Sequence, residues 1–534
     1  MLKKKMNTWQ PPKKNQRYSL IMWALIICGL ALFYINHGAA SLPALIPFKS
    51  HDTVYYAYAD EAQTLDPALA KDPQSAKVIS CIFEGLVRYK PGTSEIEPAL
   101  ATGWEISPDG LEYTFTLRKN VNFHDNTPFN AQAVKYSIER LFADNRQNYH
   151  SSLIYKYLKE VQVIDNYTVK LILNRPYAPL LRNLAMPYSA PIVSPSAARK
   201  YGSTFGINPV GTGPYLFKEW DKGNTITLSA NPYYWDQGPK IKELVFLVIP
   251  RAGDRMAGLI NGNIHLADGF TPQHLDMMKQ KEINVLTAVG ADISYLGFFV
   301  NKKPFNNAKI RQAVSSALNR RNLVENGHPD IPLAQGLLPQ GILSSQEYLT
   351  PISYNPAKAK ELLREAGYKE GIEIDLITYE ETRTYNTTGG NVLAQSIQKE
   401  LAQVNIQVNI KTYPWDEYKK ALHNQEGNAF IYGWISDSGD PDDFLYYQFN
   451  GKQNRNGLNI CRYNNPQVNV LLEQARQCTD PKLREQFYCR IQQILLKDSP
   501  WVPLNHSLHV VGISPSVKGC ILQSNGIPFL NHLH

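Results

Sequence analysis

The sequence lacks the short motifs that identify many enzymes. It contains no G-x-S-x-G, H-E-x-x-H or Walker A pattern, so it offers no nucleophile elbow, no helical zinc site and no phosphate-binding loop of these kinds. Its 12 histidines are scattered, and no cysteine–histidine spacing is typical of zinc. We therefore expect no catalytic residues, no metal ligands and no cofactor.

Charged residues are also few, at 19% of the chain, and the excess of positive charge is local. The net charge is +8, yet six cations and no acidic residue precede residue 18, which leaves about +2 for the rest. Such a basic block is typical of a membrane-targeting flank, so we expect no nucleic-acid partner. The six cations are Lys3, Lys4, Lys5, Lys13, Lys14 and Arg17.

One long apolar run follows this block, at residues 19–35, and small residues occupy 38–40. This order is typical of a secretion signal and predicts export from the cytoplasm. The run is longer than a usual signal core and slightly short for a membrane span, so an uncleaved membrane anchor stays open. A bulky residue before Cys28 argues against lipid attachment there, and residues 36–50 form an expected linker.

Cysteine is scarce: five residues follow the apolar run, and none forms C-x-x-C. Export makes disulfides possible, but the number is odd, so at least one thiol has no partner in the chain. The pairing is not determined by the sequence. The five are Cys81, Cys461, Cys478, Cys489 and Cys520.

Periodicity predicts an α/β chain, and 534 residues allow two to four domains. Apolar and polar residues alternate over 111–118, as in a half-buried strand, whereas 244–249 is apolar throughout, as in a strand buried on both faces. Asn355 before Pro356 is a helix start signal. Further strands are expected at 295–300 and 406–411, and helices at 310–318, 356–367 and 392–401.

A series of different short motifs occurs in order between about residues 53 and 515. Each is weak evidence by itself, but the ordered set is specific. Through it the chain resembles the peptide- and nickel-binding family of ABC-importer solute-binding proteins, the dipeptide- and oligopeptide-binding group. The motifs are Thr64–Pro67, Phe83–Leu86, Pro98–Trp104, Tyr113–Arg118, Phe123–Asp125, Pro209–Tyr215, Asn231–Trp235, Asn306–Ala313 and Tyr354–Ala359.

The resemblance implies an α/β, two-lobed periplasmic-binding-protein-like fold, with an extra subdomain in the first lobe and a ligand cleft between the lobes. It also implies two crossing segments between the lobes, near 292–296 and 504–511. The expected organisation is a signal or anchor segment with linker at 1–50, a first lobe at 51–294 completed by 505–534, an extra subdomain at about 75–200, and a second lobe at 295–504.

The segment 432–444, Tyr-Gly-Trp-Ile-Ser-Asp-Ser-Gly-Asp-Pro-Asp-Asp-Phe, is similar to the family's ligand segment. By that resemblance Asp437 receives the α-ammonium of a peptide, and Tyr432, Gly433 and Trp434 lie beside the ligand. The chemistry is consistent, because a carboxylate desolvated in a closed cleft needs a cation and an ammonium supplies charge with three donors.

The same segment carries three more acids, Asp440, Asp442 and Asp443, around Pro441. We interpret them as a solvated turn. A calcium loop is the alternative, but Gly439 occupies what would be the third ligand position.

A second stretch, Arg383 followed by Tyr385 and an asparagine, resembles the carboxylate-binding segment of dipeptide-binding relatives. Arg383 would clamp the peptide's carboxylate with two hydrogen bonds. The sequence departs from the family pattern directly afterwards, at 387–390. Trp415 matches a family tryptophan that lines the pocket, and with Tyr385 and Trp434 it would form an aromatic wall for varied side chains.

These expectations give one hypothesis and its rivals. The hypothesis is an exported, monomeric protein that captures di- or tripeptides by lobe closure and delivers them to the permease subunits of an ABC importer. A rival of the same class binds a longer or antimicrobial peptide, haem or a nickel chelate. A rival of another class is a hydrolase that uses the acidic cluster.

Overall fold

The computed structural model describes residues 52–143, 154, 156–325, 328–339, 341–343, 349 and 352–534. The expected signal or anchor, with its apolar run at 19–35, lies outside these residues. Among the helices of the described ranges, none has the length and hydropathy needed to cross a membrane.

The first sheet has seven strands drawn from distant parts of the chain. β1 pairs in parallel with β10 and β11, and the other neighbours pair antiparallel. In order across the sheet, the strands are β12 (Asn284–Val289), β18 (Leu508–Ile513), β11 (Leu266–Ala267), β1 (Thr53–Tyr58), β10 (Glu243–Val248), β9 (Thr225–Ala230) and β8 (Tyr215–Asp221).

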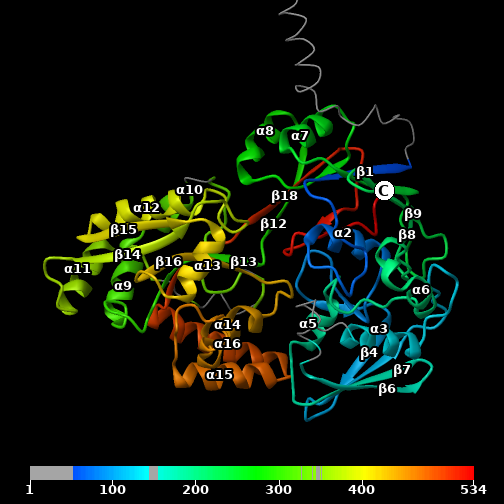
Figure 1. Ribbon diagram of the computed structural model, residues 1–534, viewed down its shortest axis with the longest axis horizontal. Helices are drawn as coiled ribbons and strands as arrows, with labels where there is room; N and C mark the ends of the chain where they lie inside the picture. Colours follow the sequence, from blue (N-terminus) through cyan, green and yellow to red (C-terminus); the bar gives the residue numbers. More distant parts are fainter. Residues whose placement is uncertain are drawn as a thin grey trace, which may run out of the picture. The chain divides into compact units, whose positions relative to one another are not determined.

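The first sheet is accompanied by short helices and by a two-stranded pair near the C-terminus (Figure 1). Its apolar core includes Tyr56, Phe246 and Ile79, each completely buried. The helices and the pair are α2 (Pro73–Ile82), α6 (Pro195–Tyr201), η1 (Gly202–Ile207), α7 (Ala252–Ile260), η2 (Pro272–His274), α8 (Leu275–Gln280), β19 (Ile521–Leu522) and β20 (Pro528–Phe529).

A separate antiparallel sheet of four strands lies between α2 and α6 in the sequence (Figure 1). Tyr113 and Phe115 of its β5 are fully buried, which fits the alternation seen in the sequence. The elements of this region are β2 (Val87–Tyr89), β3 (Ile96–Pro98), β4 (Ala101–Ile106), β5 (Glu112–Leu117), α3 (Ala131–Ala143), β6 (Leu158–Asp165), β7 (Thr168–Leu173) and α5 (Leu180–Ala185).

The third sheet has five strands, in the order β15, β14, β16, β13, β17. β14 pairs in parallel with β15 and β16, and helices α12 and α13 lie against β14 and β15 (Figure 1). The strands are β13 (Asp292–Phe298), β14 (Ile372–Tyr379), β15 (Ile406–Tyr413), β16 (Ala429–Ile435) and β17 (Trp501–Asn505). The helices are α9 (Ala308–Ala317), α10 (Arg320–Glu325), α11 (Pro356–Glu365), α12 (Gly390–Ala402), α13 (Trp415–His423), α14 (Pro441–Phe449), η4 (Gly451–Asn454), α15 (Pro466–Gln477) and α16 (Pro481–Asp498).

The α/β prediction is confirmed at the level of single elements. The predicted strands at 111–118 and 244–249 are β5 and β10, and the predicted helix at 392–401 is α12. Asn355 caps α11 as expected, because its Oδ1 accepts a 2.9 Å hydrogen bond from the Lys358 amide. The residue limits of the lobes and of the subdomain stay a prediction.

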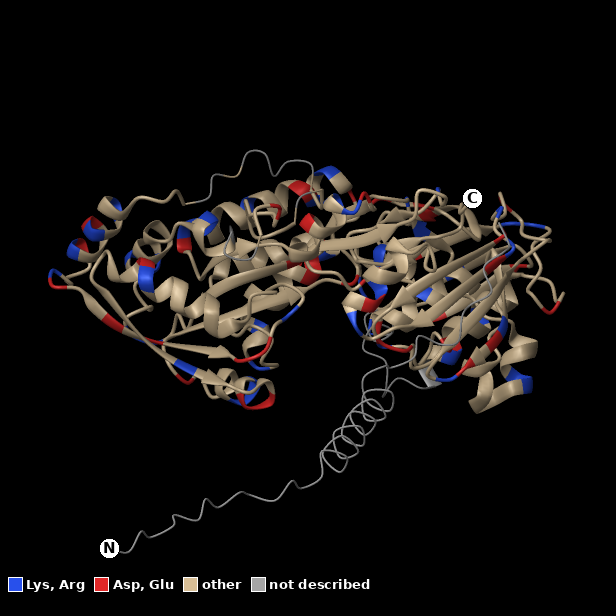
Figure 2. Ribbon diagram, turned by 90° about the horizontal axis from the view of Figure 1, so that it is seen from above, with Lys and Arg blue, Asp and Glu red and all other residues tan. Residues whose placement is uncertain are grey.

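Positions of basic and acidic residues are interspersed along the ribbon of the described residues (Figure 2). This distribution agrees with the location of the excess positive charge near the N-terminus. The five cysteines that follow the apolar run are all free thiols. Burial raises the pKa of Cys81, Cys461 and Cys520 to about 12, so these thiols stay protonated.

The chain passes between the seven-stranded and five-stranded sheets at two places that lie side by side. β12 passes into β13 at 290–291, and β17 passes back into β18 at 506–507. The Gly290 amide donates to the Ser507 carbonyl at 2.9 Å. The Asp292 carboxylate, 1% exposed, accepts from the Ser507 amide at 2.7 Å and also from the Ser507 hydroxyl. The two crossings therefore behave as one joint.

Glycine is required at position 290 because the crossings approach so closely. A Cβ atom built there would lie 2.1 Å from Ser507 Oγ and 2.7 Å from Asp292 Oδ2. Neither atom can retreat without giving up a hydrogen bond of a buried carboxylate.

We predict that Gly290→Ala lowers the free energy of unfolding by about 1–3 kcal/mol, because the added methyl group overpacks the joint. Urea denaturation followed by circular dichroism measures this. Gly253→Ala in α7 is the matched control, since no atom lies within 4 Å of a Cβ added there. Equal stability of the two variants would contradict the assignment of the joint.

Candidate functional site

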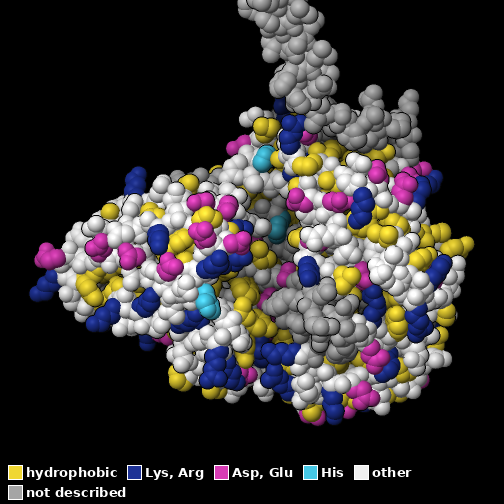
Figure 3. Space-filling model, in the orientation of Figure 1, with side chains coloured by type: hydrophobic (Ala, Val, Ile, Leu, Met, Phe, Trp, Pro, Cys, Tyr) yellow, Lys and Arg dark blue, Asp and Glu magenta, His cyan; other side chains and the backbone are white. Residues whose placement is uncertain are grey.

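A cavity of about 390 Å³ lies between elements of the seven-stranded and five-stranded sheets. Figure 3 shows a hollow near the middle of the face in view, with acidic side chains at its margin. The crossing residues Ala291, Asp292 and Ser507 line the cavity. Other charged and hydrogen-bonding side chains of the lining are Asp60, Lys77, Tyr188, Asp268, Thr384, Thr387, Asp437 and His509.

The described lining of this cavity is rich in acid, with four carboxylates and Lys77 as its one lysine or arginine. Lys77 pairs with Asp268, which also accepts a 2.8 Å hydrogen bond from the Tyr56 hydroxyl. Asp292 is satisfied by the crossing, which leaves Asp60 and Asp437 as the other two acids of the wall. Such a lining favours a ligand that carries positive charge.

Asp437 lies in the loop that joins β16 to α14, and its side chain is half-buried at the cavity wall. Its Oδ1 accepts a 2.7 Å hydrogen bond from the Tyr188 hydroxyl, which comes from the segment after α5. Burial and the neighbouring Asp437 carboxylate raise the pKa of Tyr188 well above its usual value. The hydroxyl therefore stays protonated and remains a donor.

The acids after Asp437 are not a solvated turn, and that interpretation is wrong for Asp440 and Asp442, each 1% exposed. Arg484 donates to both oxygens of Asp440, at 2.9 and 2.6 Å, and Arg476 donates twice to Asp442. Asp440 is the N-cap of α14 and accepts from the Asp442 amide at 2.8 Å. The dipeptide Asp440-Pro441 is itself a helix start signal, so this helix could have been predicted.

Asp443 differs from these acids because, among the described residues, no arginine forms a salt bridge with it. Burial is the main cause that raises the pKa of Asp443 to about 8, and the nearby carboxylates of Asp437, Asp442 and Asp440 raise it further. A hydrogen bond with Ser436 opposes this shift. Asp443 is therefore largely protonated at neutral pH.

We predict that Asp443→Asn becomes progressively more stabilising as the pH rises from about 4 to 8. The pKa of the acid is higher in the folded state than in the unfolded state, so the folded protein binds more protons and loses stability as the pH rises through this window. Asparagine does not titrate, so the variant does not lose stability in this way as the pH rises.

Denaturant titrations at pH 5 and pH 8.5 measure the effect. The advantage of the variant over the native protein should grow by more than about 1 kcal/mol between them. Asp221→Asn, at an exposed acid of β8, is the control. An unchanged advantage at both pH values would show that Asp443 is ionised in the folded protein.

Arg383 does not line the 390 Å³ cavity. Its guanidinium carbon lies 3.5 Å from the centre of the Trp415 ring, and its Nη2 lies 3.7 Å from Glu381 Oε2. Its Nε is buried without an acceptor among the described residues. Stacking on an indole fixes the plane of the guanidinium, and the Nε group still has a hydrogen bond to donate.

Four of the predicted residues gather beside Arg383. Trp415 stacks on Tyr432 with ring centres 5.9 Å apart and planes 2° apart, and Tyr385 packs on the same Tyr432. A Cβ atom at Gly433 would lie 2.4 Å from the Tyr385 ring, so only glycine fits there. Trp434 lies apart from this group and stacks on Tyr447 instead.

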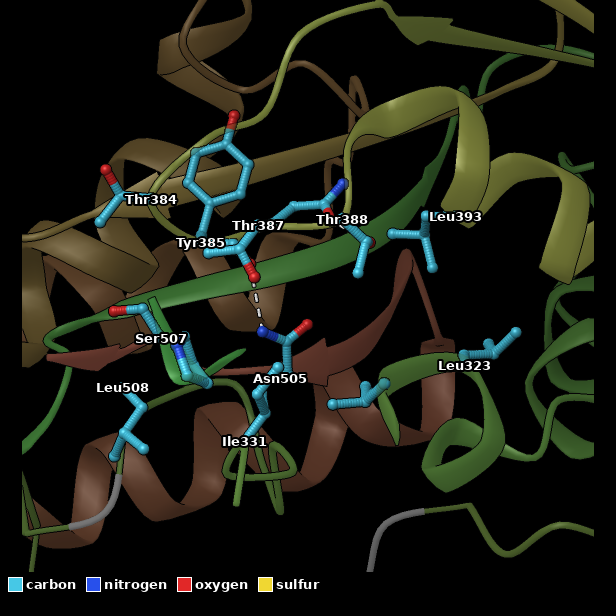
Figure 4. A pocket seen from close by; sticks show the side chains of 13 residues that line it. Leu323, Ile331, Thr384, Tyr385, Thr387, Thr388, Leu393, Asn505, Ser507 and Leu508 are labelled. Carbon is cyan, nitrogen blue, oxygen red and sulfur yellow. Dashed lines mark hydrogen bonds between the residues drawn. The ribbon is translucent and has the colours of Figure 1, made fainter. Parts of the chain in front are cut away.

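A smaller pocket, of about 20 Å³, is lined by Tyr385 of this aromatic group (Figure 4). It shares Thr384 and Thr387 with the cavity and reaches Tyr385. Asn505 of β17 lies across it and donates a 3.1 Å hydrogen bond to the Tyr385 carbonyl, the dashed line of Figure 4. Thr387 and Thr388, in the segment where the sequence departs from the family pattern, thus line this pocket, and Thr387 also lines the cavity.

The structure places residues in the cavity lining that the sequence did not indicate. Tyr188, Lys77 and Asp268 come from the region around the seven-stranded and four-stranded sheets, far in sequence from the predicted ligand segment. No local motif or periodicity marks them. Their position at the cavity depends on the crossing and on pairings such as Tyr188 with Asp437, which are 249 residues apart.

Comparison with known proteins identifies bacterial solute-binding proteins as relatives of this chain. The sequence model for bacterial extracellular solute-binding proteins, family 5 Middle, matches residues 95–456. Heme-binding protein A of Haemophilus influenzae is 34% identical over 90% of this chain and 91% of its own length. The dipeptide-binding protein of Escherichia coli is 34% identical over 83% of this chain and 87% of its own.

A solved structure, HbpA2 from Haemophilus parasuis, is 30% identical and has a TM-score of 0.84. The alignment covers 90% of this chain and 99% of that one. The two-lobed solute-binding fold expected from the sequence is confirmed by this agreement.

Proposed function

Because the chain belongs to the family-5 bacterial extracellular solute-binding proteins, we propose that its cavity captures di- and tripeptides through their free amino ends. The observation that carries this proposal is the position of Asp437, at the wall of an acid-lined cavity between the two larger sheets. Members of this family are solute-binding proteins and not enzymes, and they work with ABC permeases.

The proposed binding step is the pairing of the peptide's α-ammonium with Asp437. The carboxylate is half-buried and accepts a hydrogen bond from Tyr188. The ammonium would add a charge-assisted hydrogen bond to it. In a cavity from which water is expelled, such a charged pair is stronger than in solution. The volume of about 390 Å³ lies within the usual range for small-ligand pockets.

The other end of the peptide would extend toward Arg383. The small pocket beside Thr384 and Thr387 leads in that direction, and the Nε group of Arg383 has no acceptor within the described structure. The aromatic group of Tyr385, Trp415 and Tyr432 would then pack against the peptide side chains through apolar contacts, without specific hydrogen bonds. Side-chain tolerance and end recognition would depend on different residues.

Haem is the competing cargo, because one relative is named a heme-binding protein. The cavity lining argues against it as the main ligand. Haem carries two propionate carboxylates, whereas the wall presents four acids and one lysine that is already paired with Asp268. Like charges in a closed cavity repel, so a ligand with an ammonium group is favoured.

Delivery also requires that the protein reach the outer side of the cytoplasmic membrane. We propose that the basic block and the run at 19–35 export the chain and either are removed or stay as an anchor. We further propose that the protein acts as a monomer. N-terminal sequencing of the protein from its host distinguishes the first two outcomes.

We predict that calorimetry detects tight binding of free dipeptides and much weaker binding of their N-acetylated forms. Asp437→Asn should weaken binding of the free form by about 10- to 100-fold, the value of one or two charged hydrogen bonds. Asp221→Asn should leave the affinity unchanged. Equal affinity of the native protein for free and acetylated peptides would refute the role of Asp437.

A parallel prediction concerns the carboxylate end. Arg383→Ala should weaken binding of a free dipeptide by about 10-fold or more but should barely change binding of its C-terminal amide. Arg490→Ala, at an exposed arginine of α16, is the control. If the amide and the acid lose affinity equally in Arg383→Ala, the arginine has only a structural role. Haem added as a competitor tests the rival cargo in the same assay.

A further inference from the structure

An ion pair lies in the wall of the ligand cavity on the side of the seven-stranded sheet. Lys77 of α2 contacts Asp268, which directly follows β11, and both residues line the cavity. Their side chains are 9% and 10% exposed, so the pair is largely removed from water. Ion pairs at this depth seldom add stability, because the cost of taking two charges out of water offsets their attraction. Stability is therefore a weak explanation for the pair, and a role in binding is the alternative.

The backbone that carries Asp268 is held by a buried arginine of α7. Arg255, 1% exposed, donates hydrogen bonds to the carbonyls of Asp268 and Gly269, both at 2.9 Å, and to the carbonyl of Ile249 at 2.6 Å. Gly269 has a φ of +69°, and a Cβ atom there would lie 2.8 Å from Arg255 Nη2. The loop after β11 is thus fixed by charge-assisted hydrogen bonds before any ligand arrives.

Tyr56 of β1 fixes the orientation of the Asp268 carboxylate. Tyr56 is completely buried, and its hydroxyl donates a 2.8 Å hydrogen bond to Asp268 Oδ2, the oxygen that Lys77 also contacts. Burial and then the neighbouring carboxylate raise the pKa of Tyr56 well above its usual value, so the hydroxyl remains a donor. Within the part of the chain that the structure describes, Asp268 Oδ1 accepts no hydrogen bond, which leaves this oxygen for a ligand.

Lys77 likewise has hydrogen bonds left to form. An ammonium group carries three N–H donors. Among the described residues, the Asp268 carboxylate is the one acceptor that the Lys77 ammonium contacts. The remaining donors of a largely buried cation need acceptors, and a ligand in the cavity that Lys77 lines can supply them.

The pair therefore offers donors and an acceptor side by side. A carboxylate placed there would be attracted by Lys77 but repelled by Asp268, and an ammonium would meet the reverse conflict. A neutral amide has no such conflict, because its oxygen can accept from Lys77 while its N–H donates to Asp268 Oδ1. Both hydrogen bonds would have one ionised partner, which makes them stronger than bonds between neutral groups.

We propose that Lys77 and Asp268 form a second polar subsite of the ligand cavity, which binds a neutral amide group of the ligand. The amide is either the peptide bond itself or the side chain of an asparagine or glutamine residue. This inference rests on the proposed function. It adds a specificity determinant on the side of the cavity that the seven-stranded sheet provides.

Two pairs of matched ligands test the subsite by calorimetry. Alanyl-glutamine and alanyl-methionine have side chains of similar size, and the first alone carries a side-chain amide. Alanyl-alanine and alanyl-lactate differ at the central bond, where the ester of lactate lacks the N–H group. In the native protein the amide-bearing member of at least one pair should bind about 10-fold more tightly or better, the value of a hydrogen bond to a charged group. The pair that shows the preference identifies which amide is bound.

The variant Lys77→Met/Asp268→Leu/Tyr56→Phe replaces the polar group by apolar side chains of similar size. It leaves no buried charge and no buried hydroxyl without a partner, so the protein should still fold, which circular dichroism checks. The affinity ratio that favours the amide should fall toward one. Lys77→Met alone is a milder variant that should lower the same ratio, since Asp268 keeps its hydrogen bond from Tyr56.

Lys218→Met/Glu243→Leu is the matched control. It removes another lysine–acid pair, with 2.6 Å between Lys218 Nζ and Glu243 Oε1, that lies on β8 and β10 outside the cavity lining. This variant should keep both native ratios. Because each result is a ratio within one protein, a uniform loss of affinity does not affect it.

The outcomes separate this inference from the function on which it rests. If the native protein binds these dipeptides but neither ratio favours the amide, the inference fails alone. It also fails alone if the preference survives in the triple variant, or in Lys77→Met should the triple variant not fold. If none of the four ligands binds the native protein, the proposed function fails as well.

Discussion

The buried carboxylate of Asp292 is the interaction on which the binding site depends. It accepts two hydrogen bonds from Ser507 and thereby joins the two crossing segments. Ala291, between the strands it connects, then accepts from the amide of Ser436, at the start of the loop that carries Asp437. The loop that carries the proposed ammonium contact is therefore hydrogen-bonded directly to the joint between the sheets. A change at the joint would shift this loop and also the crossing residues that line the cavity.

The second constraint is the neutralisation of acid within one short segment. Asp440 pairs with Arg484 of α16, and Asp442 pairs with Arg476 of α15. Buried carboxylates without such partners would be costly. With these two satisfied, the negative charge that faces the cavity comes from Asp437 and its neighbours on the wall, and a cationic ligand group can balance it.

Local signals predicted much of the fold and one end of the site. Asn355 with Pro356 marked a helix, alternation marked β5, and the segment around Asp437 was recognisable from its resemblance to a family. The contacts of Tyr188 could not be predicted in this way, because they join residues far apart in sequence and leave no periodic trace. The acids after Asp437 were misinterpreted for a different reason. Their burial depends on arginines that follow more than a helix later in the chain.

The place of β18 in the seven-stranded sheet has a consequence for the order of assembly. The strand lies between β12 and β11 in the sheet, yet most of the chain separates it from β1 in the sequence. The sheet cannot complete its backbone pairing until residues 508–513 have left the ribosome, and pairings between such distant segments form slowly. A nascent chain would consequently stay incompletely folded for as long as its last strands are missing. Such a delay would keep the chain unfolded for the export that we propose.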